Sequence, residues 1–209
     1  MHRRFTILLL TLLVGGVVAS ACGGEAASAA TSGDRGEERR QPVHVDSIFP
    51  IEEEIRRFRE GLDQVETLVS GAATLEGLIS ELLSAVERSD TAAVRSLAID
   101  RAEFAYLYYP YTIYVARPYE LGPGIVWFRS QNRSGRGLDR LLALAEEGRM
   151  KSGGFTCPDG PVEHGPGSLR SGCTVEVLRS DGAYAPTQLF GSVLEHEGRF
   201  KLVSFANEL

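Results

Sequence analysis

The chain has 209 residues and a formal net charge of −6 at pH 7, and 43% of its residues are hydrophobic. The acidic balance argues against a nucleic-acid-binding protein, because binding to phosphate requires a basic face that releases counterions. Beyond its N-terminal segment, the chain has the length of one domain with a hydrophobic core.

The N-terminus has the three parts of a secretory signal peptide. Arg3 and Arg4 precede an apolar run that begins at Phe5, and small residues follow before a polar tract. A membrane-spanning helix is the alternative, but it needs about 20 apolar residues. Gly15 and Gly16 interrupt this shorter run. We therefore expect residues 1–21 to be a signal peptide.

Residues 19–23, ASACG, resemble a bacterial lipobox, in which a cysteine thiol receives a diacylglyceryl group before cleavage. Ordinary cleavage after Ala21 is the alternative. Lipidation of Cys22 would leave Cys157 and Cys173 as an even pair, which suits an oxidising compartment. The resemblance implies a lipid-anchored protein of the cell envelope, in the outer membrane facing the periplasm if the cell has one.

The segment after the cysteine consists mainly of small and charged residues and offers almost nothing to bury. Such a composition is typical of a disordered segment. We expect residues 22–47 to contain the lipid-attachment cysteine and a disordered tether, which as a flexible coil would span about 25 to 30 Å. A single domain is expected over 48–209.

The first half of this domain has helical patterns. An apolar stripe spaced four, three, four and three residues apart predicts a first helix: Ile51, Ile55, Phe58, Leu62 and Val65. The stripe covers two heptads, so it either packs within its own domain or forms a homodimer. A second stripe predicts a helix that begins near Thr74 and stops at Ser89. Asp90 and Asp100 are N-cap candidates for two further helices.

The middle of the domain is more irregular. The segment 109–124 is rich in Tyr, Pro and Gly, which predicts an ordered loop. Two separate helices are expected after it, over 125–131 and 137–147, the second ended by Gly148.

From Gly153 onward the apolar residues alternate, which is typical of strands. Four are expected, over 155–157, 173–177, 189–195 and 199–205. Turn signals separate the last three of these strands. We therefore expect consecutive hairpins in an antiparallel sheet. Helices followed by a sheet predict an α+β fold.

Two stretches resemble the nuclear-transport-factor-2-like superfamily. AVERSDTAAVRSL, residues 85–97, is similar to the passage between its first two helices, and LEHEGRFKLVSF, residues 194–205, is similar to its final hairpin. The resemblance implies N-terminal helices and a curved antiparallel sheet of about four strands, wrapped into a cone with an open mouth. Hydrolases, isomerases, dehydratases and binding modules share this shape. The catalytic positions of its enzymes do not align with this chain, so no catalytic residue is assigned.

Cys157 and Cys173 flank a segment rich in Gly and Pro, and we expect them to form a structural disulfide. A redox pair would need closer cysteines, and a metal site with His164 would lack a fourth ligand. No metal and no cofactor are expected.

An aromatic cluster is the main candidate for a pocket rim or an interface, with packing in the core as the alternative. Its candidate residues are Tyr106, Tyr109, Tyr111, Tyr114, Tyr119 and Trp127.

Two functions are compatible with these patterns. The preferred one is a non-catalytic module that binds a small molecule or an envelope protein. The alternative is a small-molecule isomerase, dehydratase or hydrolase that uses a tyrosine, Arg101, Glu103 or His196 in the cone cavity.

Overall fold

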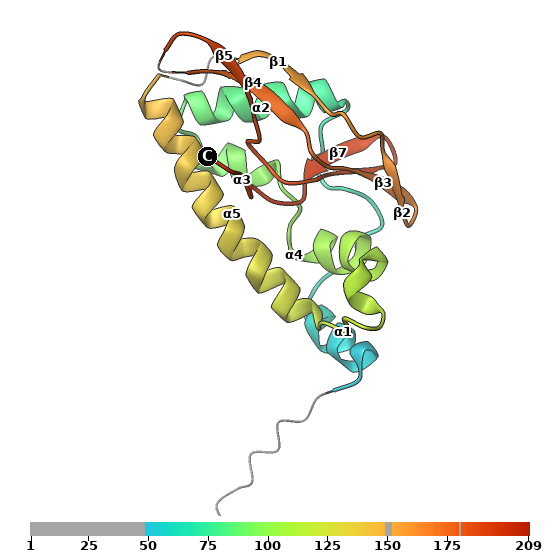
Figure 1. Cartoon of the computed structure of the whole chain (residues 1–209). Helices are drawn as coiled ribbons and strands as arrows, with labels where there is room; N and C mark the ends of the chain where they lie inside the picture. Colours follow the sequence, from blue (N-terminus) through green and yellow to red (C-terminus); the bar gives the residue numbers. More distant parts are fainter. Residues whose placement is uncertain (1–48, 149–151, 180) are drawn as a thin grey trace, which may run out of the picture. The chain divides into compact units, whose positions relative to one another are not determined.

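The computed structural model describes residues 49–148, 152–179 and 181–209, which belong to one compact unit, Asp46–Leu209 (Figure 1). The predicted signal peptide, Cys22 and the tether lie outside the described residues. The α+β prediction is confirmed, because helices precede two antiparallel sheets of three and four strands. No helix in the described ranges is both long and apolar enough to cross a bilayer.

Three of the first four helices, α2, α3 and α4, begin at a side-chain cap. Thr74 accepts a hydrogen bond from the backbone N–H of Gly77 at 3.0 Å, and Asp90 accepts one from Ala93 at 3.0 Å. Such side-chain caps satisfy N–H groups that have no partner within the helix. The elements are α1 (Ile51–Arg59), α2 (Leu75–Glu87), α3 (Thr91–Ser96) and α4 (Arg101–Glu103).

Helix α1 is shorter than its apolar stripe. It ends at Arg59, and Gly61 then adopts a φ of +75°, which takes the backbone out of the helical conformation. Phe58 is buried in the domain's own core, and Leu62 and Val65 pack against the same cluster from outside the helix. The stripe thus packs within the domain, and the homodimer stays a prediction.

The tyrosine-rich segment is a series of short turns. A π-helix, η1 (Phe104–Tyr108), continues directly from α4, and two 3₁₀ turns follow, η2 (Tyr109–Tyr111) and η3 (Ile113–Val115). The predicted ordered loop therefore contains local helical turns.

The two helices predicted after this segment are one continuous helix, α5 (Pro123–Glu146). Gly135 and Gly137 weaken the local preference for helix, because glycine inside a helix costs about 0.5–1 kcal/mol. The helix continues because the C-terminal segment packs against it: a Cβ atom on Gly137 would clash with the carbonyl oxygen of Phe205. Asn207 donates to the Gly137 carbonyl at 2.9 Å, and Phe205 N–H donates to Ser134 at 3.1 Å.

The strands form two sheets, where one was predicted. The three-stranded sheet has the order β1-β4-β5 and the four-stranded sheet the order β2-β3-β6-β7. Their bounds are β1 (Ser152–Thr156), β2 (Val162–His164), β3 (Gly167–Arg170), β4 (Thr174–Leu178), β5 (Tyr184–Thr187), β6 (Val193–His196) and β7 (Arg199–Leu202).

Both turn signals are correct, since β4 pairs with β5 and β6 with β7. The expected hairpin between the second and third predicted strands is wrong. Leu189 and Phe190 are fully buried core residues outside any strand, and the chain passes through them from one sheet to the other. The hairpin β2–β3 was not predicted.

The disulfide between Cys157 and Cys173 is confirmed, with an S–S distance of 2.03 Å. It encloses the β2–β3 hairpin and closes a loop with a sequence separation of 16 residues. A loop of this size contributes about 3 kcal/mol in the chain-entropy model.

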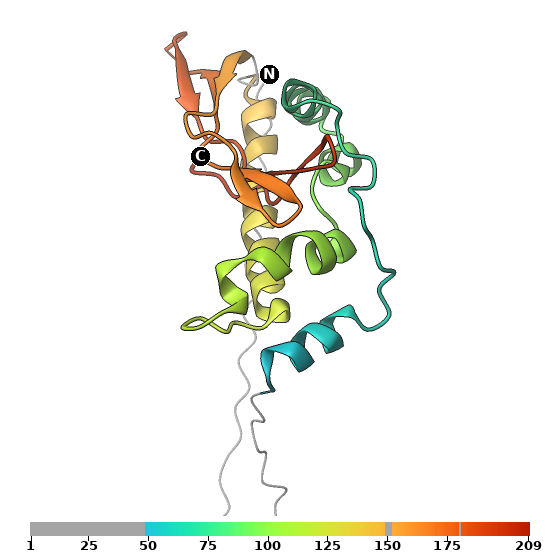
Figure 2. The same cartoon turned by 90° about the vertical axis from the view of Figure 1, so that its right-hand side faces the viewer.

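Two hydrophobic clusters form the core. One joins α2, α3 and the second half of α5 to both sheets, and the other joins α1, η1 and the first half of α5 to Leu194 of β6. Figure 2 shows α5 running along the unit, with α1 beside its first turns. Helix α5 thus spans both clusters.

Candidate functional site

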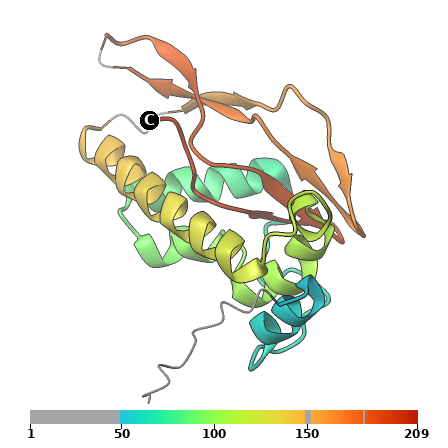
Figure 3. The same cartoon turned by 60° about the horizontal axis from the view of Figure 1, so that its bottom comes forward.

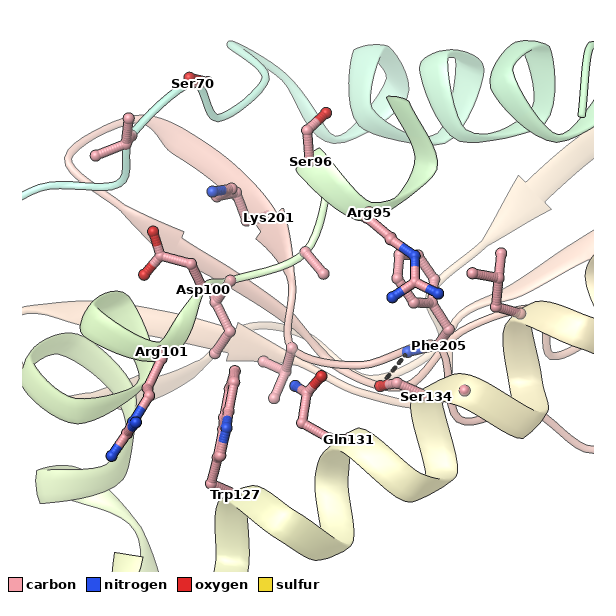
Figure 4. A pocket seen from close by; sticks show the side chains of 16 residues that line it. Ser70, Arg95, Ser96, Asp100, Arg101, Trp127, Gln131, Ser134, Lys201 and Phe205 are labelled. Carbon is pink, nitrogen blue, oxygen red and sulfur yellow. Dashed lines mark hydrogen bonds between the residues drawn. The ribbon is translucent and has the colours of Figure 1, made fainter. Parts of the chain in front are cut away.

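A cavity of about 470 Å³ lies between the α3–α4 segment, α5 and β7 (Figure 4). This volume is in the range of small-molecule sites. Its apolar walls come from four different parts of the chain, and they consist of Val69, Ile99, Trp127, Leu138, Val203 and Phe205.

Helix α5 supplies one whole wall. Trp127, Gln131, Ser134 and Leu138 are spaced four, three and four residues apart, so they lie on one helical face. Trp127 and Gln131 extend from this face into the cavity in Figure 4, and Ser134 is held by the N–H of Phe205. The wall therefore combines an indole ring with an amide that can hydrogen-bond to a ligand.

The opposite wall carries positive charge. Arg95 is exposed, lines the cavity, and has no hydrogen bond or ion pair with any residue the structure describes. Arg101 lies over the Phe58 ring, with its guanidinium carbon 4.6 Å from the ring centroid. Asp100, the acidic residue of the lining, accepts a hydrogen bond from the Glu103 N–H at 2.8 Å. An unpaired arginine beside apolar walls favours a ligand with an anionic group.

A buried ion pair lies beside the cavity. Lys201, one of its lining residues, places Nζ at 3.0 and 2.8 Å from the two carboxylate oxygens of Glu103. The two side chains are 5% and 0% exposed. The carboxylate also accepts the N–H groups of Val69 at 2.7 Å and Asp100 at 2.8 Å. All four bonds together connect three segments of the fold.

This pair has a structural role that limits its chemistry. Each Glu103 oxygen already accepts two hydrogen bonds, so neither is free to take a proton from a substrate. Removal of one partner would leave a buried charge uncompensated, which costs about 3–5 kcal/mol.

The predicted aromatic residues do not share one site. Trp127 lines the cavity, whereas Tyr109 is fully buried and its hydroxyl donates to the Leu121 carbonyl at 2.9 Å. Burial raises the pKa of Tyr109 to about 12. Tyr106 lies under the guanidinium of Arg59, 4.4 Å from the ring centroid.

The other three tyrosines lie in the segment before α5. Tyr114 is half-buried and meets the exposed Tyr119 edge to face, at 6.2 Å between ring centroids. Tyr111 is exposed and meets His164 edge to face at 5.8 Å. Only Trp127 of the six aromatic candidates thus lines the cavity between α3–α4, α5 and β7.

His164 connects the disulfide-bonded hairpin to the tyrosine segment. Its buried ring donates from Nε2 to the Tyr108 carbonyl at 2.9 Å. Burial lowers the pKa of His164 below its ordinary 6.5, against the opposing effect of that hydrogen bond. This histidine is a packing residue.

The predicted acid–base residues are not assembled into a catalytic set. His196 is buried, and its Nδ1 has no partner among the described residues. Its neighbour Glu195 accepts hydrogen bonds from Ser168 and from the Gly198 N–H. Glu103 is held by Lys201, as described above.

Sequence patterns missed most of this site. They indicate Arg101 and Trp127, but nothing in them indicates Arg95, Gln131 or Lys201. The spacing of Trp127, Gln131, Ser134 and Leu138 would have indicated the cavity wall, had residues 125–147 been treated as one helix.

Comparison of the chain with protein-family models, with curated proteins and with solved structures gives no match. The function is therefore inferred from the geometry of the site.

Proposed function

We propose that this chain is an envelope lipoprotein, anchored through Cys22, whose domain binds a small amphipathic anion in the cavity beside Trp127. The observation that carries this proposal is an apolar cavity of about 470 Å³ with an unpaired arginine, Arg95, in its lining. The chain as a whole is acidic, so a cationic group here is a local feature. The ligand class is a molecule with a hydrocarbon or ring portion and one carboxylate, sulfonate or phosphate group.

Binding without catalysis is supported by the state of the titratable groups. A general base must reach the proton that it removes. Glu103 is saturated with hydrogen bonds, and the guanidinium groups of Arg95 and Arg101 carry hydrogen-bond donors only. The cavity thus offers orientation and charge, which are the properties of a binding site.

The alternative is an isomerase, dehydratase or hydrolase acting in the same cavity. One observation favours it, namely that the carboxylate of Asp100 lines the cavity, which is where a general base would have to act. The two functions differ in the fate of the ligand. An NMR spectrum of a bound ligand stays unchanged after incubation with a binding module and gains new resonances with an enzyme.

The cone of the nuclear-transport-factor-2-like superfamily is the finer proposal for the fold. It is supported by the order of the elements and by a cavity enclosed between helices and the strand β7. The division of the strands into two sheets departs from a single curved sheet.

Trp127 provides the test, because it is the single tryptophan of the chain and lines the cavity. We expect its fluorescence to change on titration with decanoate, and to respond more weakly to the uncharged decanol. Arg95→Gln should weaken decanoate binding about tenfold, as expected for the loss of a hydrogen bond to a charged group. Equal binding of the acid and the alcohol would contradict an anion site.

The matched control is Arg88→Gln, which removes the same charge from an exposed arginine at the end of α2, outside the cavity lining. It should leave decanoate binding unchanged. A second variant, Ala98→Phe, places a large side chain in the lining and should abolish binding by both compounds. Trp127 fluorescence that responds equally in this variant would place the ligand elsewhere.

A further inference from the structure

The outward face of α5 combines apolar and basic side chains. Ile125 and Phe128 are 49% and 66% exposed, which is unusual for residues of this size. Arg129, Arg133 and Arg136 follow at helical spacing and are exposed as well. Figure 3 shows this helix along the surface of the unit, with one long side uncovered by other elements.

The three arginines are free to bind an external group. None of them has a hydrogen bond or an ion pair within the described ranges 49–148, 152–179 and 181–209. The helix contains no acidic residue before Asp139, although the chain carries 28 Asp and Glu residues against 22 Lys and Arg. The first four turns of α5 are therefore a local basic surface on an acidic protein.

Further exposed apolar side chains lie in the segment that precedes this helix in the chain. Tyr111, Ile113 and Tyr119, in the segment that leads into α5, are 47%, 62% and 57% exposed. An amphipathic helix with apolar residues and arginines on one exposed face is typical of a protein that lies on a membrane surface. Aromatic rings of this kind insert at the level of the lipid headgroups.

The described chain begins close to this surface. Residue 49 leads into α1, and the side chain of Glu54 in that helix lies against Gly122, the N-cap of α5. A tether that ends at α1 therefore attaches to the domain near the first turns of α5, where Ile125 and Phe128 are exposed. This step rests on the proposed anchor at Cys22.

A hollow beside the helix has arginine and serine side chains among largely apolar lining residues. Arg129 and Arg133 line a space of about 230 Å³ to which Ser130 and Ser204 also contribute. Two guanidinium groups with nearby hydroxyls can bind a phosphate by charge-assisted hydrogen bonds.

From these observations we infer that the outward face of α5 is a contact surface for a bilayer that contains anionic phospholipids. The apolar side chains enter the headgroup region, and the arginines bind lipid phosphates. The cavity beside Trp127 opens on the other side of the same helix, so the two surfaces do not share side chains of α5.

Co-sedimentation with vesicles tests this surface. The unit 46–209 is compact and has its own core and disulfide, so it can be used without Cys22 and without any acyl chain. We expect it to bind vesicles of phosphatidylcholine with phosphatidylglycerol, to bind those of phosphatidylcholine alone far less, and to be released by salt. Binding to neither kind, or to both equally, would overturn the inference.

Variants locate the contact. The double variant Arg129→Gln with Arg133→Gln should weaken vesicle binding roughly thirtyfold, because each basic residue near an anionic surface strengthens binding about fivefold. The control pair Arg88→Gln with Arg179→Gln removes the same charge from other elements and should change binding much less. Equal losses in the two pairs would show a response to net charge and overturn the assignment to α5.

A third variant, Phe128→Ser, should weaken vesicle binding while leaving charge unchanged. All these variants should keep the circular dichroism spectrum and the thermal midpoint of the parent unit, which shows that they fold whether or not decanoate binds. Failure of the cavity proposal and failure of the membrane contact are therefore separate results.

Capture of an acidic protein by α5, with no binding to anionic vesicles, would replace the lipid with a protein partner.

Discussion

The signals that predict helix α2 lie within its own span and at its N-cap, whereas the continuity of α5 depends on residues near the C-terminus. Leu78, Ile79, Leu82 and Val86 of α2 are buried at helical spacing, and Thr74 caps the first turn. In α5 the glycines at 135 and 137 weaken the local preference for helix. The local sequence therefore predicts α2, whereas the extent of α5 depends on tertiary contacts.

The contacts that hold α5 are specific. Besides the contacts at Ser134 and Gly137, Arg140 donates to the side chain and the backbone of Asn207 at 2.8 and 3.0 Å. Since the same helix carries one wall of the cavity, the C-terminal segment indirectly positions Trp127 and Gln131.

The largest effect is expected for Gly137→Ala. The added methyl group would clash with the Phe205 carbonyl, so the helix and the C-terminal segment must separate. Overpacking of this kind costs about 3 kcal/mol. Urea denaturation measures the free energy of unfolding, and an unchanged value would refute the close approach at Gly137.

A smaller loss is expected for Thr74→Ala in α2. The substitution removes the oxygen that accepts the Gly77 N–H, and loss of an N-cap costs about 1 kcal/mol. Thermal unfolding followed by circular dichroism is the measurement. A loss as large as that of Gly137→Ala would remove the contrast between the two helices.

Gly135→Ala should raise the free energy of unfolding by about 0.5–1 kcal/mol. Nothing lies within 4 Å of a Cβ atom at this position, so the gain in helix preference meets no clash. The variant is the matched control for Gly137→Ala, two residues away in the same helix. A destabilised Gly135→Ala protein would mean that any alanine in this stretch is unfavourable.

The smallest effect is a pH dependence from His164. Because burial lowers its folded pKa, the protonated ring favours the unfolded state. This contribution to stability is present above the unfolded value and is lost as the pH falls through the lowered folded pKa. His164→Gln should flatten the slope of unfolding free energy on the acidic side of neutrality. An identical slope in the variant would contradict the assignment.

The same contrast explains which parts of the fold were predicted. The helix start near Thr74, the caps at Asp90 and Asp100, the disulfide and the turns before β5 and β7 depend on residues close in sequence or on a cysteine count. The continuity of α5 and the change of sheet at Leu189 depend on the distant packing partners that bury them, and no local pattern contains that information.

The site was predicted less well for a related reason. The tyrosines were chosen because they are close together in sequence, and the structure distributes them among the core, the surface and a second hollow. Arg95, Gln131 and Lys201 come from three separate elements, and only the packing of α3, α5 and β7 brings them together.

Photolabelling with a decanoate analogue that carries a diazirine tests the proposed binding site most directly. The proposal predicts that mass spectrometry finds the label on the cavity side of α5, at Trp127, Gln131 or Leu138, and that Arg95→Gln reduces it. Labelling confined to Ile125 and Phe128 on the outward face, unaffected by Arg95→Gln, would contradict it.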